Sequence, residues 1–217
     1  MKKITSFALI TSALMAPVLV SAATTAELKL TGRIIPAACI PNFVGGSTID
    51  YGTIHVSTLN VTSQTMLPQK NTRMTITCEV PVKFALAGID ERAGTSEDTL
   101  TTVVGYGRGY KFGLGVASNG AKIGTYTLDM KNITADEGQT RSGVSSDGGV
   151  NWNTSVPAFS HGNIIGFSDS LKSQLPTAHK YISFDLNVVA AVVKSENLPI
   201  ADEIQIDGLT TVEVKYL

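Results

Sequence analysis

The stretch that decides the fold class is Tyr181–Lys194, which reads YISFDLNVVAAVVK. Its apolar residues recur at every second position, as Ile182, Phe184, Leu186, Val188, Ala190 and Val192. A two-residue period is that of a β-strand with one buried face, because successive side chains of a strand point to opposite sides. The stretch therefore predicts a long strand at the core of a β protein.

Three other segments carry strand patterns. Thr48–Val56 is rich in β-branched residues, which favour strands. Thr72–Cys78 and Leu209–Leu217 alternate like the first stretch, with Met74, Ile76, Cys78, Val212, Val214 and Tyr216 at every second position. We expect these segments to pack against the long strand, with the side chain of Cys78 on a buried face.

Turn signals separate the strand patterns. Asn119-Gly120 lies between two alternating stretches, residues 110–118 and 121–130. This residue pair favours a type I′ hairpin turn, in which both central residues have positive φ. Asp147-Gly148-Gly149 marks a second tight turn. Short strands joined by such turns indicate an antiparallel sheet.

The remaining segments contain little helix signal. Only Ser168–Gln174 could form a short helix, which Pro176 would end. Residues 88–109 and 134–149 are polar and glycine-rich, and they are predicted loops. No repeat or Pro-rich linker divides the chain, so residues 23–217 are predicted to form a single antiparallel β-sandwich or barrel.

The first 22 residues have the layout of a secretory signal peptide. Lys2 and Lys3 precede an apolar stretch, and small residues at Ala22 and Ala23 offer two alternative cleavage sites. No later run of 18 apolar residues exists, so no integral membrane segment is expected after cleavage. The sequence therefore predicts export through the inner membrane.

The chain has two cysteines, Cys39 and Cys78. In an exported chain an even pair normally forms a disulfide, because the compartment is oxidising. A metal site is the alternative, but the cysteines lack a CxxC spacing, and the scattered His55, His161 and His179 make a poor ligand set. We therefore expect a disulfide and no metal.

Charge and motifs argue against nucleic-acid binding and catalysis. The formal net charge is −1 and the basic residues are scattered, so no electrostatic surface for nucleic acid is expected. Gly105–Gly109 resembles a phosphate loop, but a strand pattern follows it where a helix is needed. No Gly-x-Ser-x-Gly motif occurs. The sequence predicts neither an enzyme, nor a catalytic residue, nor a cofactor.

Four motifs in order resemble the pilins of bacterial chaperone–usher fimbriae. Glu27–Cys39 (ELKLTGRIIPAAC) is similar to their N-terminal signature, an alternating extension followed by Gly-x-Val/Ile and Ala-Cys. Ile49–Ile54 matches an apolar-x-x-Gly-x-Val/Ile strand, and Cys78 stands where their second cysteine does. Thr211–Leu217 is similar to their last strand with its penultimate Tyr.

This resemblance implies an immunoglobulin-like sandwich that lacks its own last strand, with loop insertions. A periplasmic chaperone would supply a strand first, and the N-terminal extension of the next subunit would replace it at an outer-membrane usher. Residues 23–31 are then the candidate donor segment, with Ala26, Leu28 and Leu30 as donor side chains. Val212, Val214 and Tyr216 would lie on the strand that meets the chaperone. The implied role is a fimbrial subunit in surface adhesion, present in the periplasm and then in the fimbrium at the cell surface.

Asp50–Gly52, Phe112–Gly124 and Val214–Leu217 resemble a narrower group. These are pilin-like enterobacterial secreted proteins of unknown function, one of them encoded with glutamate synthase. Two alternatives stay open at this point. Leu28 and Leu30 belong either to a donor segment or to a first strand within their own sandwich. The chain is either a polymerising subunit or a soluble periplasmic binding or regulatory protein whose fold is complete.

Overall fold

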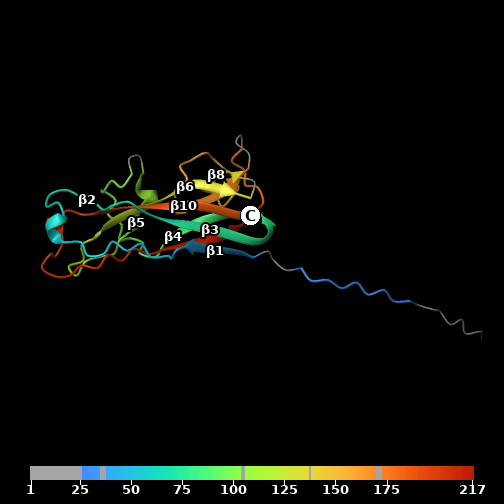
Figure 1. Cartoon of the computed structure of the whole chain (residues 1–217), viewed down its shortest axis with the longest axis horizontal. Helices are drawn as coiled ribbons and strands as arrows, with labels where there is room; N and C mark the ends of the chain where they lie inside the picture. Colours follow the sequence, from blue (N-terminus) through green and yellow to red (C-terminus); the bar gives the residue numbers. More distant parts are fainter. Residues whose placement is uncertain (1–25, 35–37, 104–105, 137, 170–172) are drawn as a thin grey trace, which may run out of the picture. The chain divides into compact units, whose positions relative to one another are not determined.

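The computed structural model describes residues 26–34, 38–103, 106–136, 138–169 and 173–217 (Figure 1). Residues 36–217 form one compact unit, and residues 1–35 cluster separately from it. The predicted signal peptide, residues 1–22, lies outside the described residues. The first strand of the compact unit begins at Cys39.

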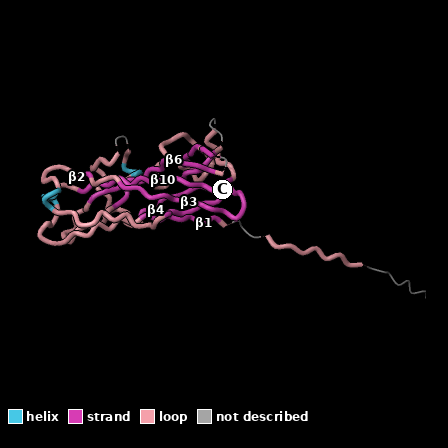
Figure 2. Tube along the Cα trace, viewed as in Figure 1, coloured by secondary structure: helices cyan, strands magenta, loops and turns pink. Residues whose placement is uncertain are grey.

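The described chain contains eleven strands and three single turns of 3-10 helix, connected by loops. The strands are β1 (Cys39–Val44), β2 (Thr65–Met66), β3 (Lys70–Val82), β4 (Phe84–Asp90), β5 (Phe112–Gly113), β6 (Gly124–Ala135), β7 (Gly138–Gln139), β8 (Arg141–Ser145), β9 (Ile164–Ser168), β10 (His179–Val192) and β11 (Thr210–Tyr216). The 3-10 turns are η1 (Val56–Thr58), η2 (Arg108–Tyr110) and η3 (Ser195–Asn197). Figure 2 shows these strands and the long loops that connect them; none of the described residues lies in an α-helix.

The strands form two antiparallel sheets. One has the order β1-β3-β10-β6-β5, with β2 added to β10 and β7 added to β6. The other has the order β11-β4-β9-β8. All of these pairings are antiparallel, and the two sheets enclose one apolar core. The predicted antiparallel β-sandwich is confirmed.

The buried core contains the apolar side chains that occupy every second position of β10. Its six apolar positions are buried, and Ile182 and Phe184 have no exposed surface. Phe184 lies opposite Met74 of β3, so the alternating faces of the two neighbouring strands point the same way. The ring of Phe167, from the other sheet, lies 6.4 Å from that of Phe184 and 5.9 Å from that of Phe84. These rings join the two layers.

The turn at Asn119-Gly120 differs from the prediction. Only Gly120 has a positive φ, of +80°, whereas a type I′ turn needs two such residues. The Gly120 N–H donates to the Ala117 carbonyl, and the Ala117 N–H donates to the Ala121 carbonyl, both at 2.8 Å. The loop therefore has three residues and a glycine bulge, the next most common hairpin connection.

Two further predictions are wrong. Ser168 ends strand β9, and residues 173 and 174 are not helical, while residues 170–172 lie outside the described part. The predicted loop at 134–149 contains the end of β6 and the whole of β7 and β8, whereas the described part of the predicted loop at 88–109 contains no strand beyond the end of β4 at Asp90. Pairing with β9 stabilises the polar segment of β8, which has no strand pattern of its own.

Candidate functional site

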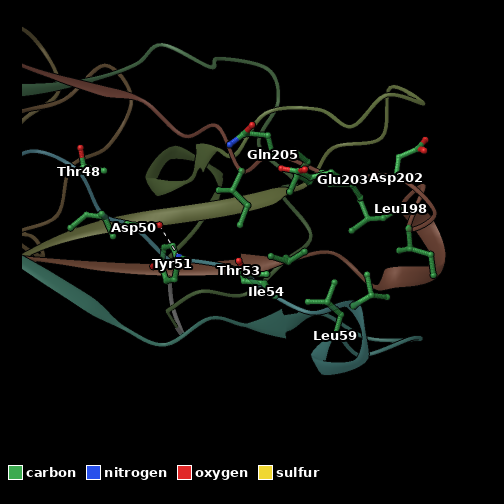
Figure 3. Close-up of a pocket in the computed structure, with 18 residues that line it drawn as sticks. Thr48, Asp50, Tyr51, Thr53, Ile54, Leu59, Leu198, Asp202, Glu203 and Gln205 are labelled. Atoms are coloured by element: carbon green, nitrogen blue, oxygen red, sulfur yellow. Dashed lines mark hydrogen bonds between the residues drawn. The ribbon is translucent and has the colours of Figure 1, made fainter.

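An open groove runs between two segments that are distant in the sequence. It has a volume of about 600 Å³. Residues 48–54 line one side, residues 200–206 line the other, and Ile123, Val192 and Leu198 lie beneath. Figure 3 shows Glu203 and Gln205 on one wall and Tyr51, Ile54 and Leu59 on the other.

The walls of the groove are apolar and only partly covered. Their larger side chains are intermediate in exposure and pack against the core from its edge; these are Ile49, Tyr51, Ile54, Leu59, Ile204 and Ile206. The residues beneath are buried, with exposures of 2% for Ile123, 3% for Val192 and 7% for Leu198. The groove therefore exposes one edge of the hydrophobic core to solvent.

Neither wall belongs to a sheet. Among the described residues, segments 48–54 and 203–206 make no backbone-to-backbone hydrogen bond. The predicted strand at Thr48–Val56 is therefore wrong as a paired strand: residues 48–55 join no ladder, and residues 56–58 form η1. The β-branched residues of this segment favour an extended chain, but no described strand hydrogen-bonds to it.

Strand β11 continues the second wall as an edge strand. The Glu91 N–H donates to the Leu209 carbonyl at 3.0 Å, and the Leu217 N–H donates to the Lys83 carbonyl at 3.1 Å. In this register the odd-numbered residues of β11 direct their backbone N–H and C=O groups toward β4. Hydrogen-bonded and free positions alternate in an antiparallel edge strand. The backbone groups that point away from β4 are those of Thr210, Val212, Val214 and Tyr216.

Lys70 and Gly52 shape the first wall. The Lys70 ammonium donates to the carbonyl of Asp50 at 2.6 Å, and it lies 5.4 Å from the centre of the Tyr51 ring. The Gly52 N–H donates to the Asp50 carboxylate at 2.7 Å (dashed line in Figure 3). Gly52 has a φ of +63°, which only glycine adopts without strain. This turn directs the Tyr51 side chain toward the core.

The second wall is held at its far end by Asp207. Its carboxylate accepts two hydrogen bonds from the Arg92 guanidinium, at 2.7 and 2.8 Å, and its N–H donates to the Leu114 carbonyl at 3.1 Å. Three residues on, the hydroxyl oxygens of Thr210 and Tyr126 lie 2.6 Å apart. These contacts fix the position at which the unpaired wall joins β11.

The Arg92–Asp207 pair makes a testable prediction about pH. The hydrogen bonds and charge of Arg92 lower the pKa of Asp207 below its usual value of 3.8. A lowered folded-state pKa stabilises the fold above pH 3.8, and this contribution is lost as pH falls through the lowered pKa. In an NMR titration of the carboxyl groups, we expect Arg92→Gln to raise the pKa of Asp207 and Arg92→Lys to raise it less. If the pKa of Asp207 were unchanged in Arg92→Gln, the hydrogen-bonded Arg92–Asp207 pair would be contradicted.

The groove also has an acidic character. Asp50, Asp202 and Glu203 are exposed on its walls, against the single positive charge of Lys70, whose ammonium lies beside Asp50 and Tyr51. Burial raises the pKa of Tyr51, and its hydroxyl oxygen is buried without a hydrogen-bond partner in the described chain. A buried hydroxyl without a partner is costly, by roughly 1–3 kcal/mol. The groove thus combines apolar surface, unpaired backbone and negative charge.

The predicted site residues fall into two sets. Cys39 and Cys78 form the predicted disulfide, and Cys78 is 1% exposed at the buried face of β3. Val212 and Val214 are half-buried on β11 beside the groove wall. Tyr216 is 52% exposed, and its hydroxyl accepts a hydrogen bond from the Cys39 N–H at 2.8 Å.

The candidate donor residues lie in the separate N-terminal unit. Residues 26–34 belong to no strand, and Ala26, Leu28 and Leu30 are all exposed, with Leu28 and Leu30 at 89% and 88%. The described segment therefore does not form a first strand of its own sandwich. No sequence-based prediction included Ile204 or Ile206. A two-residue alternation at these positions is the one signal that could have indicated them.

No helix in the described ranges is long and apolar enough to cross a membrane. Within the same ranges, no group of three His, Cys, Asp or Glu side chains is placed to hold a metal ion.

Known proteins resemble this chain over most of its length. Residues 28–127 match the family model "Protein of unknown function (DUF1120)". Protein GltF of Escherichia coli (strain K12) is 31% identical, and the alignment covers 89% of each chain. The uncharacterized protein YhcF of the same organism is 31% identical over 56% of this chain and 57% of its own. These matches agree with the resemblance to a narrower group of enterobacterial proteins of unknown function.

Proposed function

We propose that this chain, which belongs to the DUF1120 family of proteins of unknown function, is an exported, non-enzymatic subunit. In this proposal it polymerises by accepting a β-strand from another subunit. The observation that carries the proposal is the groove: residues 48–54 and 203–206 of its walls make no backbone-to-backbone hydrogen bond in the described chain, and it exposes one edge of the core. An inserted strand would cover the apolar surface and pair with β11.

Physical chemistry favours such an occupant. An unpaired sheet edge beside exposed apolar surface tends to recruit another strand, because both the backbone groups and the side chains lack partners. Addition of a strand gives affinity through main-chain hydrogen bonds and specificity through alternate side chains. Val212 and Val214 combine both features, since they have outward backbone groups and half-buried side chains.

The proposed occupant is residues 26–34 of a second copy of this chain. In an extended conformation these nine residues span about 30 Å, with Ala26, Leu28 and Leu30 on one face. Lys29 and Arg33 then lie on the opposite face. Glu27 lies on that face as well, so the segment carries a net charge of +1, opposite in sign to the acidic residues of the groove walls, and we expect the interaction to weaken as salt concentration rises.

This mode of contact produces a fibre. The donor segment and the acceptor groove are different surfaces, so each subunit can accept one strand and donate another without closing a ring. The proposed partners are therefore other subunits, preceded by a periplasmic chaperone that covers the groove and an outer-membrane usher. The proposed location is the periplasm and then a fimbrium at the cell surface, where the fibre contributes to adhesion.

Binding of a synthetic peptide tests the proposal. A fluorescent peptide with the sequence of residues 26–34 should bind the purified chain, as measured by anisotropy. Ile206→Arg, on the groove wall, should weaken binding roughly tenfold or more, since it places a charge against the buried leucines. Val150→Arg is the matched control, because Val150 is 76% exposed and lies outside the groove.

Two results would argue against strand acceptance. One is a wild-type chain that does not bind the peptide, and the other is equal binding by Ile206→Arg. A chain that stays monomeric with its groove unoccupied would instead fit a soluble periplasmic binding or regulatory protein.

A further inference from the structure

The first wall of the groove, residues 48–54, is joined to the sheets by a single polar contact. Among the described residues, one hydrogen bond links this segment to the rest of the chain: the Lys70 ammonium donates to the Asp50 carbonyl at 2.6 Å. The other hydrogen bond of the segment, from the Gly52 N–H to the Asp50 carboxylate, lies within its own turn. The rest of its attachment is the packing of its apolar side chains against the edge of the core.

Lys70 is well placed to hold this wall. It is the first residue of β3 and lies opposite Val188 of β10, so its backbone is anchored in the first sheet. It is not among the residues that line the groove, yet its ammonium lies 5.4 Å from the centre of the Tyr51 ring. A hydrogen bond from a charged donor is stronger than one between neutral groups, and a cation near the face of an aromatic ring is attracted to it. Both contacts act on adjacent residues of the wall, Asp50 and Tyr51.

Without Lys70, little would keep the wall in this position. The Tyr51 hydroxyl is buried without a hydrogen-bond partner in the described chain, so the observed position of its side chain carries a cost. Segments with few backbone hydrogen bonds open locally at a much lower free energy than the strands of the core. Loss of the Lys70 contact should therefore release the wall while the sandwich stays folded.

We infer that Lys70 is a positioning residue, which fixes the first wall of the groove in the place where an incoming strand would meet it. The inference rests on the proposed function, because it concerns the acceptor side of the proposed strand contact. A wall that is already ordered adds no ordering cost to binding, whereas a loose wall must be ordered by the strand that arrives. Lys70 thus increases the affinity for the strand through the wall that it holds.

Backbone 15N relaxation of residues 49–54 tests this role in the free chain. In the wild type we expect order parameters close to those of the sheets. In Lys70→Met, which keeps the aliphatic stem but loses the ammonium, they should fall below about 0.6, while those of the sheets are unchanged. Lys70→Arg retains a charged donor and should keep the wall ordered. Lys83→Met is the matched control, because Lys83 is exposed and lies outside the groove lining.

Binding of the peptide of residues 26–34 then separates the wall from the charge. Lys70→Met should weaken binding roughly tenfold, whereas Lys70→Arg and Lys83→Met should bind as the wild type does. Removal of a positive charge beside an acidic groove would by itself strengthen binding of a peptide of charge +1, so weaker binding reports the loosened wall.

The outcomes distinguish the inference from the proposed function. If Lys70→Met leaves the wall ordered, or leaves the affinity for the peptide unchanged, the inference fails. A fall in the order parameters of the sheets as well would show a general loss of structure and would also overturn it. If the wild type binds no peptide, the proposed function fails, and the relaxation of the free chain still decides whether Lys70 holds the wall.

Discussion

Without residues 24–30, the exported chain should fold normally but form no polymer. The described part of this segment is exposed and joins no strand, so its removal should leave the thermal unfolding of the sandwich unchanged. It does, however, remove the leucines that would enter the groove of the next subunit. Full burial of a leucine contributes about 2 kcal/mol, so losing Leu28 and Leu30 should weaken the contact roughly a thousandfold.

Point variants separate the side chains from the length of the segment. Leu28→Asp with Leu30→Asp should abolish polymers, as seen by size-exclusion chromatography and electron microscopy of the secreted material. Glu27→Ser with Thr31→Ser alters the opposite face of the same extended segment and should leave assembly unchanged. Polymers of normal length from the aspartate variant, or from the deleted chain, would reject the donor role.

Loss of the disulfide should have the largest effect on stability. The bond joins residues separated by 39 positions, and closing a loop of this length stabilises the fold by about 4 kcal/mol in the chain-entropy model. We expect the double variant Cys39→Ala with Cys78→Ala to lose most of that free energy of unfolding in urea denaturation. The variant should also lose the fixed position of Cys39 that the Tyr216 hydroxyl contacts.

Reduction of the wild-type chain provides the matched control. Wild type in excess thiol should unfold at the urea concentration of the double variant, and the double variant should not respond to thiol. A loss of less than about 1 kcal/mol in the double variant would show that the native sandwich holds β1 in place without the bond.

The central strands were predictable because their patterns are dictated by burial. A strand between two others buries one complete face, so β10 carries an uninterrupted two-residue alternation that no other conformation accommodates. The same reasoning located β3, and β11 was located by its alternation although it is an edge strand with only half-buried side chains. It failed for β8, which is polar, and for the turn at Gly120, where the number of loop residues depends on the register of the paired strands.

The candidate site was only half predictable. The sequence indicated the alternating donor residues, the two cysteines and β11, because each of these is a local pattern or a simple count. It also assigned Thr48–Val56 to a strand, which matches its β-branched composition but not its unpaired backbone. Composition indicates which backbone conformation a segment prefers, whereas the presence or absence of a strand that pairs with it is decided by how the sheets assemble.

The sequence by itself therefore determined the β class, the buried faces of the long strands and the chemistry of the N-terminal segment. All of these follow from residue type and from the two-residue period of a strand. Only the tertiary structure decided that Ile49 and Ile204 line the same open groove, and that Tyr216 reaches Cys39. These residues are separated by more than 150 positions, and a contact over such a distance depends on the packing of two complete sheets.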